Sequence, residues 1–128
     1  MQREQKFFLC KHCGNLIGFL DNAGVQVICC GEAMTELKPN TVDASAEKHV
    51  PVVTQTGDTV EVAVGSVPHP STEEHHITWV YLLTEQGGQR KNLMIGKEPK
   101  AVFALAGGDV VLGAFAYCNL HGLWKSSV

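Results

Sequence analysis

The chain has 128 residues, of which 45% are hydrophobic and 18% are charged, so it is long and apolar enough for one ordinary domain, or for one modest domain with a very small companion. Its formal net charge of −3 excludes a generally basic protein that coats nucleic acid, and no apolar run approaches the roughly 18 residues of a membrane span. The charged N-terminus reaches only three apolar residues before Cys10, which is unlike a signal peptide, so we expect a cytoplasmic protein.

Four of the five cysteines are clustered near the N-terminus, with Cys10 and Cys13 in a Cys-x-x-Cys pair and Cys29 directly before Cys30. Neighbouring Cα atoms lie about 3.8 Å apart, whereas a disulfide prefers roughly 4.4–6.8 Å, so a bridge between Cys29 and Cys30 would be strained. In a reducing cytoplasm such spacing indicates metal ligands before disulfides. Tetrahedral sulfur sites suit zinc and iron alike, so the spacing leaves both metals open.

The first domain is expected to span residues 1–37. Short strands are predicted there at Lys6–Leu9, Leu16–Leu20 and Val25–Ile28. A domain below about 40 residues usually needs a metal or disulfides, so the metal is expected to hold this segment together. The polar, small-residue stretch 38–46 has the composition of a linker.

Residues 38–128 show the pattern of a β-sheet protein. In Thr59–Val64 three valines alternate with other residues, which is typical of a half-buried strand. Further strands are predicted at Val50–Thr54, Ile77–Leu83, Asn92–Ile95, Ala101–Leu105 and Val110–Tyr117, with turns at Gly57-Asp58, Gly87-Gly88 and Gly107-Gly108-Asp109. Six or seven short strands without a segment of helical period predict an immunoglobulin-like antiparallel β-sandwich.

Five of the six histidines lie in this β region, in or beside expected turns: His49, His69, His75, His76 and His121. Cys118 and His121 form a Cys-x-x-His pair, a spacing that lets two side chains reach one metal at a strand end. A structural zinc site closes with four ligands, whereas several imidazoles and one thiolate fit a larger coordination number. Iron with an open position is the natural candidate.

Over essentially its whole length the sequence resembles desulfoferrodoxin, the two-iron type of superoxide reductase. The matching motifs are Cys10-x-x-Cys13, Cys29-Cys30-Gly31, Glu47-Lys48-His49-Val50-Pro51-Val52, Gly65-Ser66-Val67-Pro68-His69-Pro70, Glu74-His75 and Tyr117-Cys118-Asn119-Leu120-His121-Gly122. The resemblance implies a small desulforedoxin-like, rubredoxin-related domain followed by the immunoglobulin-like sandwich.

The resemblance also implies two irons per chain. The first would be held by Cys10, Cys13, Cys29 and Cys30, and the second by His49, His69, His75, His121 and an axial Cys118. His76 departs from the family pattern, which commonly has a bulky aromatic residue there. Because adjacent strand residues point to opposite faces, only one of His75 and His76 can bind, and we assign His75. His12, beside the metal loop, is interpreted as a surface or hydrogen-bonded residue.

The activity implied by the resemblance is reduction of superoxide to hydrogen peroxide, a detoxification under oxidative stress without oxygen evolution. Electrons would come from an external donor such as reduced rubredoxin, and the protein would be a homodimer. Lys48 resembles the residue that steers superoxide and orders water for protonation, and Glu47 the carboxylate that occupies the sixth position once iron is ferric. On sequence alone an exposed Glu-Lys pair is more often a solvated surface.

Other function classes stay open on the residues alone. The alternative is a non-catalytic iron protein for electron transfer or redox sensing, with both irons coordinatively closed. A zinc-structured binding module is a second rival, separated by metal analysis. A dismutase is a third, and it would evolve oxygen and need no external reductant.

Overall fold

The computed structural model describes residues 4–128, which separate into two compact units with the division between Lys38 and Pro39. The assignment of residues 1–37 and 38–128 as separate domains stays a prediction, and the first three residues lie outside the described part. In residues 4–128 no helix is long and apolar enough to cross a membrane.

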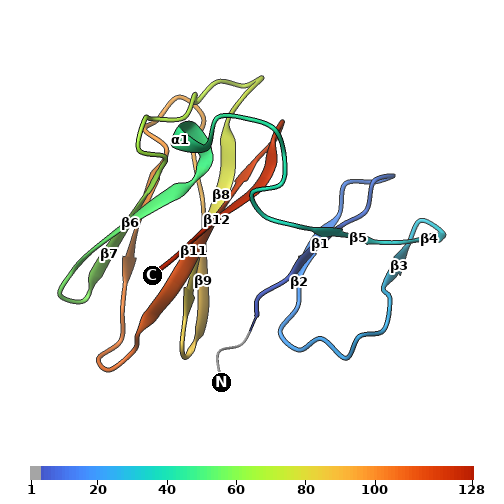
Figure 1. Ribbon diagram of the computed structural model, residues 1–128, viewed down its shortest axis with the longest axis horizontal. Helices are drawn as coiled ribbons and strands as arrows, with labels where there is room; N and C mark the ends of the chain where they lie inside the picture. Colours follow the sequence, from blue (N-terminus) through green and yellow to red (C-terminus); the bar gives the residue numbers. More distant parts are fainter. Residues whose placement is uncertain (1–3) are drawn as a thin grey trace. The chain divides into compact units, whose positions relative to one another are not determined.

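The first unit consists of short antiparallel strands (Figure 1). Strand β1 (Phe7–Leu9) lies between β2 (Leu16–Gly18) and β5 (Thr35–Leu37), while β3 (Ile28–Cys29) and β4 (Glu32–Ala33) form a separate hairpin. The strand predicted at Val25–Ile28 therefore begins later, and β4 and β5 were not predicted. Strands this short bury few side chains, so alternation gives little signal for them.

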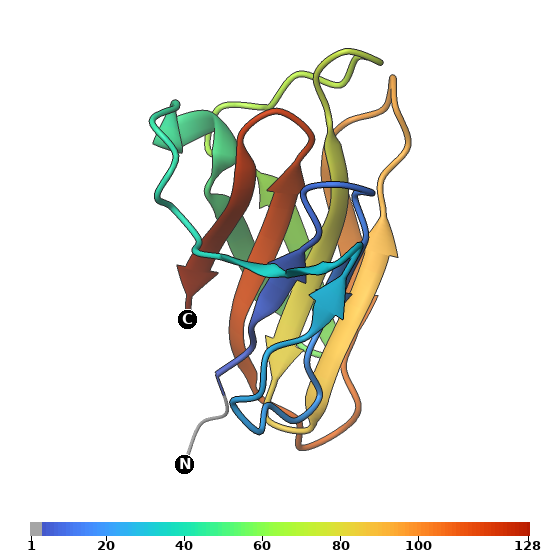
Figure 2. The ribbon, with the colours of Figure 1, turned by 90° about the vertical axis from the view of Figure 1, so that its right-hand side faces the viewer.

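The second unit is a sandwich of two antiparallel sheets, which face each other in Figures 1 and 2. One sheet has the order β10-β7-β6 and the other β12-β11-β8-β9. Their bounds are β6 Pro51–Thr56, β7 Thr59–Val64, β8 Ile77–Thr84, β9 Gly87–Asn92, β10 Lys100–Ala104, β11 Val111–Cys118 and β12 Gly122–Ser127. The expected fold class, a small cysteine-bearing unit followed by an antiparallel β-sandwich, is confirmed.

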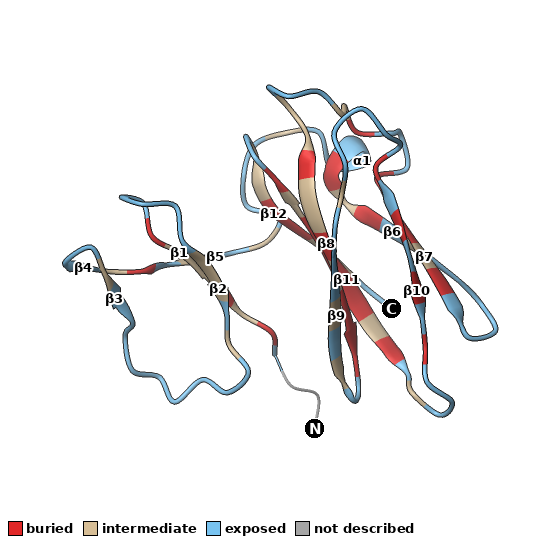
Figure 3. Ribbon diagram, turned by 180° about the vertical axis from the view of Figure 1, so that it is seen from behind, coloured by how far each residue is buried: buried red, intermediate tan, exposed pale blue. Residues whose placement is uncertain are grey.

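The core of the sandwich follows the predicted alternation. Val60, Val62 and Val64 of β7 are each at most 1% exposed, whereas Thr59 is exposed and Glu61 is half-buried. They pack in one cluster with side chains of the opposite sheet, including Val80 and Leu82, and Figure 3 shows the buried positions recurring along these strands. The rigid sandwich supports the loops at its ends.

Two predicted boundaries in this unit are wrong for local reasons. The turn after β8 falls on residues 85–86, so Gly87-Gly88 begins β9 and does not form the turn; of Asn92–Ile95 only Asn92 is in a strand. A Cβ at Gly88 would lie 1.9 Å from the Tyr81 hydroxyl, so this glycine lets the tyrosine cross the neighbouring strand. Strand β12 was also not predicted.

A single helical turn, α1 (Ala46–His49), replaces the expected end of the linker and start of a strand. The N–H of Val50 closes it by donating to the carbonyl of Ala46 at 2.9 Å. Proline at position 51 disfavours helical conformation in Val50, so the helix ends there and β6 begins. His49 thus closes a helix directly before a strand.

Strand register places the starts of β6, β8 and β12 and the ends of β7 and β11 at one end of the sandwich. Pro51 at the start of β6 pairs with Val64 at the end of β7, while Cys118 at the end of β11 pairs with both Ile77 and Gly122. The segments that carry the histidines precede β6, follow β7, precede β8 and connect β11 to β12. Helix α1 lies at this end (Figure 1).

Candidate metal centres

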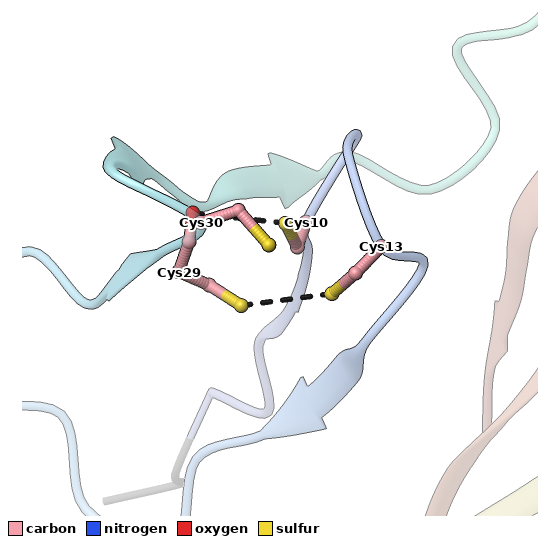
Figure 4. A group of neighbouring side chains, drawn as sticks. All are labelled: Cys10, Cys13, Cys29 and Cys30. Carbon is pink, nitrogen blue, oxygen red and sulfur yellow. Dashed lines mark hydrogen bonds between the residues drawn. The ribbon is translucent and has the colours of Figure 1, made fainter.

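The four N-terminal cysteines converge in the first unit (Figure 4). The sulfur atoms of Cys10, Cys13, Cys29 and Cys30 all lie within 4.8 Å of one another, and the Sγ atoms of Cys13 and Cys29 are 3.6 Å apart. Cys10 is buried, whereas Cys13 and Cys30 are exposed. Four sulfurs at this separation can surround one metal ion.

The hairpin between β3 and β4 explains how two adjacent cysteines reach one centre. Cys29 is the last residue of β3, and Cys30 and Gly31 form the two-residue turn with φ of 53° and 77°. Positive φ at both central positions is typical of a type I′ hairpin turn. Cys30 therefore leaves the extended conformation, in which its side chain would point away from that of Cys29.

Hydrogen bonds fix the backbone of the Cys-x-x-Cys loop and reach one of its sulfur atoms. The N–H of Gly14 donates to the Cys10 carbonyl at 2.9 Å, and the N–H of Asn15 donates to Cys13 Sγ at 3.5 Å. Hydrogen bonds, above all that from the main-chain N–H of Cys13, lower the pKa of Cys10 to about 6, so this thiol ionises before those of Cys29 and Cys30. The protonated thiol of Cys30 makes hydrogen bonds with Cys13 and Cys10 that would be lost on ionisation, and this raises the pKa of Cys30 to about 12. A metal cation would release the remaining protons.

His12 and Glu32 join the two cysteine loops from outside. His12 Nε2 lies 2.5 Å from Glu32 Oε2, and both side chains are more than half exposed. The interpretation of His12 as a hydrogen-bonded surface residue agrees with this contact.

A second cluster lies at the loop-bearing end of the sandwich. The ligand atoms of His49, His75, Cys118 and His121 all lie within 4.8 Å of one another. His69 adjoins them: its Nε2 lies 3.2 Å from His49 Nε2 and 3.5 Å from Cys118 Sγ. The structure therefore brings together all five side chains that the sequence predicted for the second site.

The four imidazole rings form a closed cycle in the order His49, His69, His75, His121. Centroids of neighbouring rings lie 4.5–5.0 Å apart and their planes are nearly perpendicular, at 78–83°. The opposite rings of His49 and His75 are 6.1 Å apart and tilted by 33°. Four nitrogen donors thus surround one position, with the thiol of Cys118 beside His69 and His121.

Backbone carbonyls orient two of these rings. His49 Nδ1 lies 2.6 Å from the Ser45 carbonyl, and His69 Nδ1 lies 2.7 Å from the Pro70 carbonyl. A carbonyl oxygen only accepts, so Nδ1 carries the proton in each ring and the lone pair of Nε2 faces the cluster. His121 differs, since its Nδ1 faces His49 Nε2 at 3.1 Å.

Burial favours the neutral form of His49, His69 and His75, which is the form that binds a metal. Desolvation lowers the pKa of His49 and His75, and it lowers the pKa of His69 to about 4. The charge of Lys48 is a smaller cause of the lowered pKa of His49 and His75. Lys48 therefore lies close enough for its charge to act on the cluster.

His75 and His76 lie in different environments. His75 Nε2 is buried, and no described residue forms a hydrogen bond with it. Buried nitrogens usually have a hydrogen-bond partner, so one that has none and lies among other ligand atoms is well suited to bind a metal ion. His76 instead donates from Nδ1 to the Thr72 carbonyl at 2.9 Å, and it is not part of the cluster.

The residues Glu47 and Lys48 are both exposed on α1, directly before His49. The carbonyl of Glu47 accepts from the N–H of Val67 at 2.9 Å and from the hydroxyl of Ser66 at 3.2 Å, which ties α1 to the loop that carries His69. Their side chains are free to reach solvent near the site.

Two residues that support the site were not predicted from the sequence. Asn119 lies within the last motif, but no role was predicted for it, and Trp124 lies two residues beyond the end of that motif. Asn119 binds the segment that carries His75, and Trp124 contacts His49 and His121. Their closeness to the Cys-x-x-His pair was the only signal in the sequence. Side chains that act through backbone atoms have no periodic pattern.

Comparison with known proteins supports this reading of the two clusters. Residues 41–127 match the sequence profile of the Desulfoferrodoxin family. The chain is 43% identical to the desulfoferrodoxin of Syntrophotalea carbinolica over 98% of each chain. It is 40% identical to the superoxide reductase of Pyrococcus horikoshii, covering 67% of this chain and 90% of that one. The crystal structure of the superoxide reductase from Treponema pallidum is similar with a TM-score of 0.84 and 46% identity, covering 98% of this chain and all of that chain.

Proposed function

Because the chain belongs to the desulfoferrodoxin family, we propose that it is a superoxide reductase, which reduces superoxide by one electron to hydrogen peroxide without releasing oxygen. The observation that carries this function is the convergence of four imidazoles and one thiol at a single position. Superoxide takes up one electron and two protons in this reaction, so the site must supply an electron and admit water.

Both clusters fit iron. We assign the first iron to Cys10, Cys13, Cys29 and Cys30, and the second to His49, His69, His75, His121 and Cys118. Mixed nitrogen and thiolate donors suit iron, and the buried, unpartnered Nε2 of His75 gives an ion a place to bind. When bound, iron supplies the redox chemistry of both clusters: a ferrous ion at the imidazole cluster gives the electron, and the cysteine-bound ion stores another.

The donor set makes the second site attractive to an anion. Four neutral imidazoles and one thiolate together carry one negative charge. A bound divalent cation carries two positive charges, so the site as a whole would keep one positive charge. Cys118, His49 and His69 are at most 3% exposed, so water screens the net positive charge of this site only weakly. Superoxide, a monovalent anion, is therefore drawn to this end of the sandwich.

Lys48 adds to this attraction in our proposal. Its ammonium is exposed on α1 next to His49, and its charge acts on His49 and His75. We assign it two tasks, steering superoxide and ordering the water that delivers protons. We assign a different task to Glu47, its exposed neighbour. Its carboxylate would occupy the open position of the second site after hydrogen peroxide has left.

The donor and the setting of the reaction complete the proposal. An external reductant must return one electron per turnover, and reduced rubredoxin or a similar small redox protein fits that requirement. We further propose that the protein works in the cytoplasm as a homodimer.

The activity is tested by mixing the pre-reduced protein with superoxide and measuring both products. One hydrogen peroxide per superoxide consumed, with no oxygen, supports a reductase. Oxygen evolution would indicate a dismutase, and absence of reaction in the iron-loaded protein would indicate electron transfer or redox sensing alone. Cys118→Ala is the matched control, because it removes one ligand of the second site and leaves the cysteine cluster intact.

The role of Lys48 is tested by rates across a salt series. Exposed charges are screened over about 8–10 Å at 0.1–0.15 M salt, so the rate of the parent should fall as salt rises. Lys48→Ile should slow the first step by about 10-fold and flatten the salt dependence. Lys97→Ile, which removes the same charge from another exposed position, is the control. If Lys48→Ile and the parent react with superoxide at equal rates at low salt, Lys48 does not steer superoxide and is an ordinary solvated surface residue.

The division of labour between the two sites is tested with Cys13→Ser. This change should abolish or weaken the spectrum of the cysteine site. The pre-reduced variant should still consume superoxide at the parental rate. Loss of the fast reaction, with the second iron shown to be intact, would refute the assignment of storage to the first site.

A further inference from the structure

Trp124 contacts two members of the imidazole cluster through different parts of one side chain. It lies in β12 and is 3% exposed. Its ring stacks on the imidazole of His49, with centroids 4.8 Å apart and planes 29° from parallel. Its indole Nε1–H donates to the carbonyl of His121 at 3.1 Å.

These contacts join segments that are distant in sequence. His49 ends α1, whereas His121 lies 72 residues later in the turn before β12. Stacking limits the rotation of the His49 ring, whose Nδ1 is already bound to Ser45. The indole hydrogen bond fixes the main chain of His121, so it helps to set where Nδ1 of that residue points.

We propose that Trp124 is a positioning residue, which fixes the His49 ring and the His121 turn before the metal binds. The inference rests on the proposed function, because it assumes that the imidazole cluster holds the catalytic metal. Any buried indole N–H needs an acceptor, but here the acceptor and the stacking partner both belong to the imidazole cluster. Residues that orient ligands in this way typically change metal affinity by about 10–100-fold when replaced.

The second tryptophan offers a matched control. Trp79 lies in β8 of the same unit and stacks on Tyr117, with centroids 5.6 Å apart and planes at 8°. Trp79→Phe therefore removes an indole from an aromatic stack on the same unit, but not from His49 or His121.

The experiment is titration of the metal-free full chain with Co(II), followed by its absorption spectrum. Bands of the second site are those absent from Cys118→Ala, which separates them from bands of the cysteine cluster. Trp124→Leu should bind Co(II) at this site about 10-fold more weakly or worse, with shifted band energies in the saturated protein. Trp124→Phe keeps a ring against His49 and loses only the N–H, so its loss should be smaller. Trp79→Phe should match the parent.

Band energies distinguish positioning from a loss of stability, because a protein that is only less stable binds the ion in the parental geometry once it is folded. Parental affinity and band energies in Trp124→Leu would overturn the proposal. If Trp124→Leu does not fold, Trp124→Phe decides in the same way. If the parent shows no Cys118-dependent bands, both the proposed function and this inference are wrong. If the parent shows them, a negative result with the Trp124 variants contradicts only the role of Trp124.

Discussion

Asn119 Oδ1 accepts a hydrogen bond from the backbone N–H of His76 at 2.9 Å, and Asn119 Nδ2 donates to the carbonyl of Glu74 at 3.0 Å. One side chain thus binds the main chain on both sides of His75. The backbone N–H of Asn119 adds a third bond, to the carbonyl of His76 at 3.2 Å. Because Asn119 directly follows Cys118, these bonds hold the His75 segment against the segment that carries Cys118 and His121.

Asn119→Ala should loosen the second site by removing both side-chain bonds. We expect about 10-fold weaker metal binding there and an unchanged spectrum of the cysteine cluster. Asn40→Gly is the control, because Asn40 also exchanges two hydrogen bonds with one backbone residue, Lys125, which is not a member of the imidazole cluster. Equal metal affinities in the two variants, measured by titration, would contradict a specific role for Asn119.

Gly65→Ala should displace α1 and with it His49 and Lys48. A Cβ at Gly65 would lie 2.5 Å from the backbone oxygen of Glu47, closer than real contacts allow. We expect an altered second-site spectrum and slower superoxide consumption. Gly107→Ala, where a Cβ would meet no atom within 4 Å, should behave like the parent. A parental spectrum in Gly65→Ala would contradict the expected displacement of His49.

The neighbouring histidines should respond differently to alanine. His75→Ala removes the ring whose Nε2 faces the cluster, so the absorption of the second site should shift or vanish. His76→Ala removes a ring bound to the Thr72 carbonyl and should leave that absorption unchanged. Absorption spectra of the two variants check this, and an essential His76 beside a dispensable His75 would reverse our ligand assignment.

The metal-free protein should lose stability in mild acid. Burial lowers the pKa of His69 from 6.5 to about 4, so between these values the unfolded chain binds a proton that the folded chain does not. The free energy of unfolding should therefore fall as pH drops from about 6.5 to 4, by roughly 2–3 kcal/mol for this one group. Urea unfolding followed by tryptophan fluorescence reports on the sandwich, because Trp79 and Trp124 both lie in it. His69→Gln should flatten the slope, and a parental slope in that variant would assign the acid sensitivity elsewhere.

The sequence by itself determined the fold class and the residues available for metal binding. Alternation in Thr59–Val64 predicted a strand with one buried face, and that face is buried because apolar side chains on one side of a strand must leave water. The Cys-x-x-Cys and Cys-x-x-His spacings were informative because only two residues separate the partners, so both side chains stay close whatever the rest of the fold. Only the choice between His75 and His76 rested on an assumed strand; both residues precede β8, which starts at Ile77.

The tertiary structure alone decided how those residues meet and what holds them. Cys29 and Cys30 face one centre because the second adopts a positive φ in a hairpin turn, a property of the backbone. His49 and His121 meet because strand register brings α1 and the β11–β12 turn to the same end of the sandwich. The supporting roles of Asn119 and Trp124 were not predictable from spacing, since each acts through carbonyls, amides or ring faces of residues that only folding makes its neighbours.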